Sequence, residues 1–162
     1  CKIDDIEWYD EIYKLKNRDY SKLLAIIVPD FETLKKYTNI TDEQIEFLKN
    51  YNKAFSVILD IKNKSDFISE NIKNKDLYWK ISFRIATKEN YEFVKENKAM
   101  FLTSANLSWL WETYSLEEIK EQFWDNFSKL KLIWNKKKLD IVPASDIIEF
   151  WENNEIIFLR KS

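Results

Sequence analysis

The chain has 162 residues, 45% of them hydrophobic and 16% aromatic, with charges of both signs and a formal net charge of −2. This composition is typical of a single globular domain with a substantial core. One cysteine excludes an internal disulfide, and the absence of histidine argues against a zinc site. The net charge gives no basic footprint for nucleic acid. No apolar run reaches membrane-spanning length, so we expect a cytoplasmic protein without membrane contact.

Apolar periodicity and capping residues predict alternating helices and strands. Helices are expected from Asp4 or Asp5 to about Lys16, and over 30–37, 41–51, 89–97 and 115–123. Capping boxes open the third and fifth helices at Thr41 and Ser115, and Thr87 is expected to cap the fourth. Strands are expected over 24–28, 55–61, 79–85, 99–102, 130–134 and 155–159, and residues 63–75 form a loop or short helix. The predicted fold class is α+β, a twisted mixed sheet of about seven strands with helices packed on its faces.

The strand at 99–102 ends abruptly in Thr103-Ser104-Ala105-Asn106-Leu107-Ser108. Hydroxyl and amide side chains at a strand end can hydrogen-bond a ligand, and α/β sheets place their ligands there. An ordinary turn built from Ser and Asn is the alternative.

This hexapeptide resembles the TSANxSG signature of the YrdC/Sua5 family, the threonylcarbamoyl-AMP synthases. Further matches follow in the same order along nearly the whole chain. A basic segment resembles K-x-R-P-x-x-K-P-L, one strand end resembles V-x-V-R-x-P, residues 144–149 resemble P-S-T/E-I-x-D, and residues 160–162 resemble R-x-G. The residues in register are Lys16, Arg18, Lys22, Arg84, Ser145 and Arg160. Asp19 and Leu23 replace the prolines of the first motif.

The resemblance implies a YrdC-like fold and an ATP-dependent synthesis of L-threonylcarbamoyladenylate. The substrates would be ATP, L-threonine and bicarbonate, pyrophosphate would be released, and Mg²⁺ is the expected metal. The product would pass to tRNA threonylcarbamoyl transferase proteins for N6-threonylcarbamoyl modification of tRNA adenosine. Direct tRNA binding is not implied, and the net charge argues against it.

The resemblance also implies roles for individual residues. Positioning and charge neutralisation would fall to Lys16, Arg18, Lys22 and Arg84. ATP would contact Lys16, Arg18, Ser104, Asn106 and Arg160, and threonine would lie beside Arg84, Thr103 and Ser145. No residue is expected to be a resident metal ligand. The three arginines of the chain all occupy family positions. Arg and Lys are not interchangeable at a bidentate site, so this placement favours a role in ligand binding.

The family has an N-terminal strand and a P-T-[DE]-x-x-Y/F-G segment before the first matched residue. We therefore expect residues 1–162 to form a single YrdC-like domain that lacks one wall of its site. Two other functions stay open. One is a carbamoyl-transfer domain of the hydrogenase-maturation type, and the other is a non-catalytic module that binds RNA or the ribosome.

Glycine is absent from the chain, although average usage of about 7% would give about 11 residues. Trp109, Trp124 and Trp151 stand where the family has glycine, and Trp79, Trp111 and Trp134 lie in turn-like contexts. We hypothesise that a stop-type codon read as glycine in the source organism has been translated as tryptophan. Seven genuine core aromatics are the alternative, and Trp8 fits it.

Overall fold

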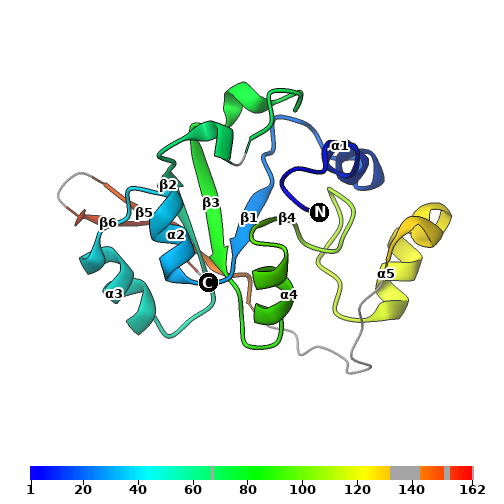
Figure 1. Ribbon diagram of the computed structural model, residues 1–162. Helices are drawn as coiled ribbons and strands as arrows, with labels where there is room; N and C mark the ends of the chain where they lie inside the picture. The colour runs from blue at the N-terminus through cyan, green and yellow to red at the C-terminus, as the bar shows by residue number, and fades with distance from the viewer. Residues whose placement is uncertain (67, 132–142, 152–153, 162) are drawn as a thin grey trace.

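The computed structural model describes residues 1–66, 68–131, 143–151 and 154–161. Its centre is a mixed sheet of six strands in the order β4-β1-β3-β2-β5-β6 (Figure 1). β1 is parallel to β3 and antiparallel to β4, whereas β2 is antiparallel to β3 and parallel to β5. The strands are β1 (Ala25–Val28), β2 (Phe55–Asp60), β3 (Lys80–Ile85), β4 (Met100–Leu102), β5 (Asp146–Phe150) and β6 (Ile156–Arg160).

Five α-helices accompany the sheet: α1 (Ile6–Leu15), α2 (Phe31–Tyr37), α3 (Asp42–Asn50), α4 (Tyr91–Glu96) and α5 (Leu116–Gln122). Helices α2 and α4 contact β1, and α1 and α5 lie toward the β4 end of the sheet, far from β6 (Figure 1). Both predicted capping boxes are confirmed, at Thr41 and at Ser115. Asp5 caps α1 by accepting the amide hydrogen of Trp8.

Two details of the predicted fold are wrong, and a third prediction, the strand 130–134, lies mostly outside the described residues. Helix α4 begins at Tyr91 with Asn90 as its N-cap, because the Thr87 hydroxyl bonds the Asn90 side chain within the preceding turn. Strand β5 was not predicted at all. In the predicted strand 130–134, Leu130 ends the 3₁₀ helix Trp124–Lys129 instead, and 132–134 lie outside the described residues. The described residues thus give six strands where about seven were expected.

One face of the sheet carries the core. Ile26, Phe83, Val57 and Ile148 lie side by side across four strands, and all four are fully buried. Side chains alternate between the faces of a strand, so the neighbours of these residues point to the opposite face. There the sequence places the small residues Ala25, Ser56 and Ser82 beside larger ones, Ile27, Ile58 and Ile147. The opposite face therefore has room above its small residues.

A buried network of hydroxyl groups attaches the polar segment 16–24 to this core. Tyr9 bonds Tyr78 at 2.8 Å and Asn74 at 2.7 Å, and Tyr13 donates to the Lys22 carbonyl at 3.1 Å. Asn74 also donates to the Tyr20 carbonyl at 2.6 Å. Burial raises the pKa of Tyr9 and of Tyr78 above the usual range of tyrosine, so both stay protonated as donors. The segment 16–24 is thus fixed by side chains far away in sequence.

Replacing Phe83 with alanine tests the position of the core. Phe83 is fully buried at the centre of the sheet, so Phe83→Ala should lower the free energy of unfolding by about 3–5 kcal/mol. Phe93→Ala is the matched control, because Phe93 on α4 is exposed. Its replacement should lower the free energy of unfolding by about 0.5 kcal/mol or less. Denaturant unfolding measures both, and equal losses would contradict the assignment of the core face.

Candidate functional site

A cavity of about 720 Å³ lies over the small-residue face of the sheet. Its volume falls within the range of small-molecule sites, roughly 300–1,000 Å³. Five of the nine predicted site residues line it: Arg84, Thr103, Ser104, Ser145 and Arg160. They come from β3, from the loop after β4, from the residue before β5, and from the end of β6. Ala25, Ser56 and Ser82 form its floor.

Ser145 lies between two guanidinium groups at this cavity. Arg84 donates one hydrogen bond to the Ser145 hydroxyl and another, 3.1 Å long, to the Ser56 hydroxyl. Arg160 donates two bonds, of 2.9 and 2.7 Å, to the Ser145 carbonyl oxygen. Burial lowers the pKa of Arg84, and the neighbouring charge of Arg160 lowers it further. Each arginine is therefore held in place by neutral oxygen atoms.

Within the part of the chain that the structure describes, neither arginine forms an ion pair, and Glu112 is the only acidic residue lining the cavity. Two cations beside one carboxylate leave the cavity with an excess of positive charge. A partly buried guanidinium is stabilised by an oxyanion that it can bind through two hydrogen bonds. Carboxylate and phosphate groups are the ligands that fit.

The predicted signature loop, residues 103–108, is held by contacts from three directions. The Lys16 ammonium donates to the carbonyls of Ser104, at 2.6 Å, and Asn106. The Gln122 side chain of α5 accepts the Leu107 amide hydrogen at 2.9 Å. The Thr113 hydroxyl donates to the Ala105 carbonyl at 2.5 Å. The edge of the cavity that this loop forms is thus fixed in the free protein.

The three predicted basic residues of segment 16–22 do not line the cavity. Arg18 is folded onto its own segment and donates to the carbonyls of Lys22 and Leu23, both at 2.8 Å. The Lys22 ammonium lies 4.1 Å from the centre of the Trp109 ring. Lys16 reaches the signature loop but not the cavity itself. The structure brings this segment beside the loop, and its contact with a ligand stays a prediction.

Asn106, the remaining predicted residue, lies within the loop and not on the cavity wall. Its side-chain amide donates to the carbonyls of Leu107, at 3.0 Å, and Leu110, at 2.8 Å. Its side-chain oxygen and the Ser108 hydroxyl are buried, and neither has a hydrogen-bond partner among the described residues. A buried polar atom without a partner is costly, so a ligand or water near this loop would be stabilising.

Sequence reasoning missed Glu112, Thr113 and Tyr114, which line the cavity, and Gln122, which holds the loop. Tyr114 donates to the Glu112 carboxylate at 3.1 Å. These residues follow the signature but match no motif, and a short polar segment before a capping box reads as a simple connection. Their position depends on how α5 folds back toward residues 103–108, which local pattern does not reveal.

The described residues contain no group of three or more acidic, histidine or cysteine side chains able to hold a metal. No helix of the described residues is long and apolar enough to cross a membrane.

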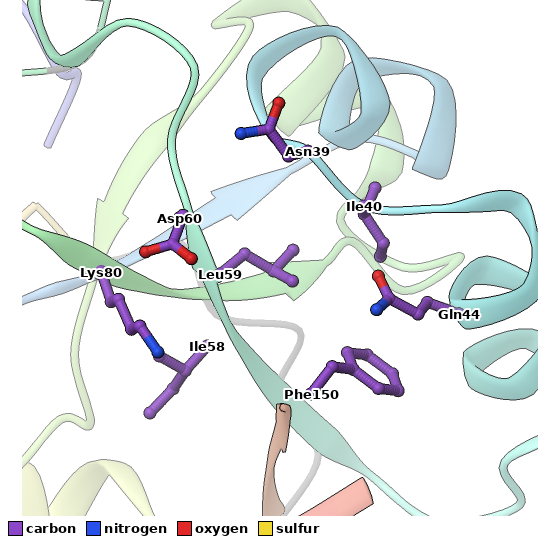
Figure 2. Close-up of a pocket in the computed structure, with 8 residues that line it drawn as sticks. All are labelled: Asn39, Ile40, Gln44, Ile58, Leu59, Asp60, Lys80 and Phe150. Carbon is purple, nitrogen blue, oxygen red and sulfur yellow. The ribbon is translucent and has the colours of Figure 1, made fainter. Parts of the chain in front are cut away.

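A second cavity, shown in Figure 2, is a weaker candidate. It measures about 100 Å³ and is lined by Asn39, Ile40, Gln44, Ile58, Leu59, Asp60, Lys80 and Phe150. In Figure 2 the Lys80 side chain extends toward Ile58 and away from the Asp60 carboxylate, and Asn39 lies apart from both. Lys80 instead pairs with Glu149. The polar groups do not converge, and none is a predicted site residue.

The buried ammonium of Lys16 gives a pH-dependent test of the site's geometry. Burial lowers the pKa of Lys16 from 10.5 to about 8, and the charge of Arg18 contributes. The unfolded chain thus binds this proton more tightly, and stability should rise as pH increases from 8 to 10.5. Relative to Lys16→Met, the free energy of unfolding of the wild type should gain at most about 3 kcal/mol over that range. Parallel pH profiles would contradict the burial of a charged Lys16.

Three solved structures resemble the chain. P. abyssi Sua5, crystallised with L-threonine, matches with a TM-score of 0.76 and 20% identity, over 98% of this chain and 45% of that one. Full-length HypF in a phosphate- and nucleotide-bound form matches with a TM-score of 0.76 and 18% identity, over 98% of this chain and 24% of that one. E. coli YciO matches with a TM-score of 0.72 and 20% identity, over 99% of this chain and 76% of that one. At these identities the likeness shows the fold, and the chain spans less than half the length of the Sua5 protein.

No curated protein sequence matches the chain. The Sua5/YciO/YrdC family model, described as telomere recombination, matches residues 1–162 from end to end. That match agrees with the mixed six-stranded sheet and with the motifs gathered around the cavity. The chain belongs to the Sua5/YciO/YrdC family.

Proposed function

We propose that the chain carries the site of an L-threonylcarbamoyladenylate synthase. The reaction uses ATP, L-threonine and bicarbonate, releases pyrophosphate, and supplies the threonylcarbamoyl group for tRNA modification. The observation that carries the proposal is the pair Arg84 and Arg160, which meet at Ser145 without an ion pair among the described residues. Family membership and the threonine-bound Sua5 neighbour support it.

The chemistry needs charge neutralisation more than a nucleophile. The threonine amine adds to the carbon of bicarbonate, water leaves, and an N-carboxylate (a carbamate) forms. A carbamate oxygen then attacks the α-phosphorus of ATP, and the bond to the β-phosphate oxygen breaks to release pyrophosphate. Both reactants are anions, so fixed cations that are already oriented lower the barrier to their approach.

The geometry suggests a division of roles. Arg84 and Ser145, at the sheet face, suit the carboxylate and carbamate of the threonine part. Arg160 and the signature loop at Thr103 and Ser104 suit the nucleotide, whose phosphates would carry Mg²⁺. Arg18 and Lys22, next to the loop, are placed to meet the leaving pyrophosphate after a rotation of their side chains.

Pyrophosphate release from ATP tests the proposal. Release should require both threonine and bicarbonate. Arg84→Ala and Arg160→Ala should each lower kcat/KM by about 10- to 150-fold, the loss of one charge-assisted contact of about 1.5–3 kcal/mol. Lys88→Ala is the matched control, because this exposed lysine follows the same strand as Arg84 but does not line the cavity, and it should leave the rate unchanged.

The chain resembles HypF and Sua5 equally well in fold, with a TM-score of 0.76 for each. The same assay can distinguish the proposed reaction from one of the hydrogenase-maturation type. Carbamate, supplied as its ammonium salt, replaces threonine and bicarbonate in a second reaction mixture. Pyrophosphate released with carbamate, and not with threonine and bicarbonate, would contradict the proposal. If neither mixture reacts although ATP binds, the site is a non-catalytic nucleotide-binding site.

A further inference from the structure

We propose that Lys16 is a positioning residue that fixes the signature loop 103–108, and not a ligand of the phosphates. The inference rests on the proposed function only in that the fixed loop is taken to bind the nucleotide. Its basis is the set of contacts that residue 16 makes in the free protein.

Residue 16 joins the loop through both its main chain and its side chain. The Lys16 carbonyl, at the C-terminus of α1, accepts the Ser108 amide hydrogen at 2.9 Å. Its ammonium donates to the carbonyls of Ser104 and Asn106. These bonds connect α1 to both ends of the segment 104–108, across about 90 residues of sequence.

The ammonium is already occupied by these carbonyls. Lys16 is 4% exposed, and it forms no ion pair with a carboxylate among the described residues. Reaching a phosphate in the cavity would require it to leave two carbonyls and to release the loop. Arg18 is the charged neighbour that acts on Lys16, and it repels the ammonium. A buried lysine held by main-chain oxygens therefore acts through the loop.

Amide hydrogen exchange of the ligand-free protein tests this role. In Lys16→Met, the protected amides of Leu107, Ser108 and Leu110 should exchange at least about tenfold faster, whereas core amides of β1 and β3 keep their rates. Lys14→Met is the matched control, because Lys14 lies on the same helix, is exposed and pairs with Glu11. It should leave the loop unchanged.

Nucleotide binding provides a second readout. Lys16→Met should weaken ATP binding but keep the salt dependence of the wild type, because no phosphate contact is lost. Arg160→Ala should reduce that dependence. Unchanged loop exchange, or a reduced salt dependence in Lys16→Met, would overturn the positioning role. If ATP does not bind to any variant, the proposed function fails while the exchange result still decides the role of Lys16.

A separate observation concerns position 109, and from it we infer that glycine occupies this position in the native protein. Trp109 has φ = 99°, a backbone conformation that is open to glycine but strained for a residue with a Cβ atom. The other residues with positive φ among those described are two asparagines and a lysine, with φ between 47° and 66°.

The exposure of the tryptophans supports the same inference. Trp109 is 76% exposed, and Trp79, Trp111, Trp124 and Trp151 are 58–78% exposed, although tryptophan is on average a highly buried residue. Trp8, which the sequence placed in the core, is also 45% exposed, so that prediction is wrong. Trp134 lies outside the described residues. Several tryptophans of this glycine-free chain thus lie in solvent, and one of them has a backbone conformation that favours glycine.

Peptide mass spectrometry of the protein isolated from its source cells decides the residue. A peptide that spans positions 102–114 should have the mass for glycine at 109, and tryptophan there would overturn the inference. In protein made with tryptophan at position 109, Trp109→Gly should raise the midpoint of denaturant unfolding by removing the strain. Trp111→Gly is the matched control, because Trp111 is equally exposed but has no positive φ, and it should not raise the midpoint.

Discussion

The difference between the two faces of the central sheet is the constraint on which the rest of the structure depends. Phe83 and its neighbours across the strands are large and fully buried on one face. Ser82, which precedes Phe83, and Ser56, which precedes Val57, are small and polar and point to the other face. A one-residue shift in register would exchange the two faces, and the core and the cavity would be lost together. The alternation that holds the fold together therefore also creates the site.

The electrostatics of the cavity follow from this arrangement. Arg84 extends from the small-residue face of a central strand, where burial would be costly without hydrogen-bond acceptors. Ser56 and Ser145 supply neutral acceptors, so the guanidinium is oriented while its charge is left without a counterion among the described residues. Such a site is prepared for an anion before the anion arrives. Arg84 and Arg160 each lie near the end of a strand, so the sheet itself sets the position of both guanidinium groups.

Much of the fold could be predicted from sequence because the signals were local. The capping boxes at Thr41 and Ser115 and the apolar runs of β1 and β4 fixed element types without tertiary information. Strand β5 has two adjacent isoleucines between Asp146 and Glu149 and therefore no period-two alternation, so local pattern does not predict it. The family motifs named Arg84, Ser145 and Arg160, which line one cavity in the structure although no periodicity links them, and their contact with a ligand stays a prediction. Local pattern could not show that Lys16 turns to main-chain carbonyls, because that depends on the packing of α1 beside the loop.

The central claim is that the cavity over the small-residue face binds the substrates, and chemical-shift mapping by NMR tests it most directly. Isotope-labelled protein would be titrated with ATP and Mg²⁺, and then with L-threonine. We expect shifts of the amide resonances of residues 103–106 and Ser145, and of the guanidinium resonances of Arg84 and Arg160. Shifts confined to the smaller cavity at Gln44 and Asp60, with these resonances unchanged, would contradict it.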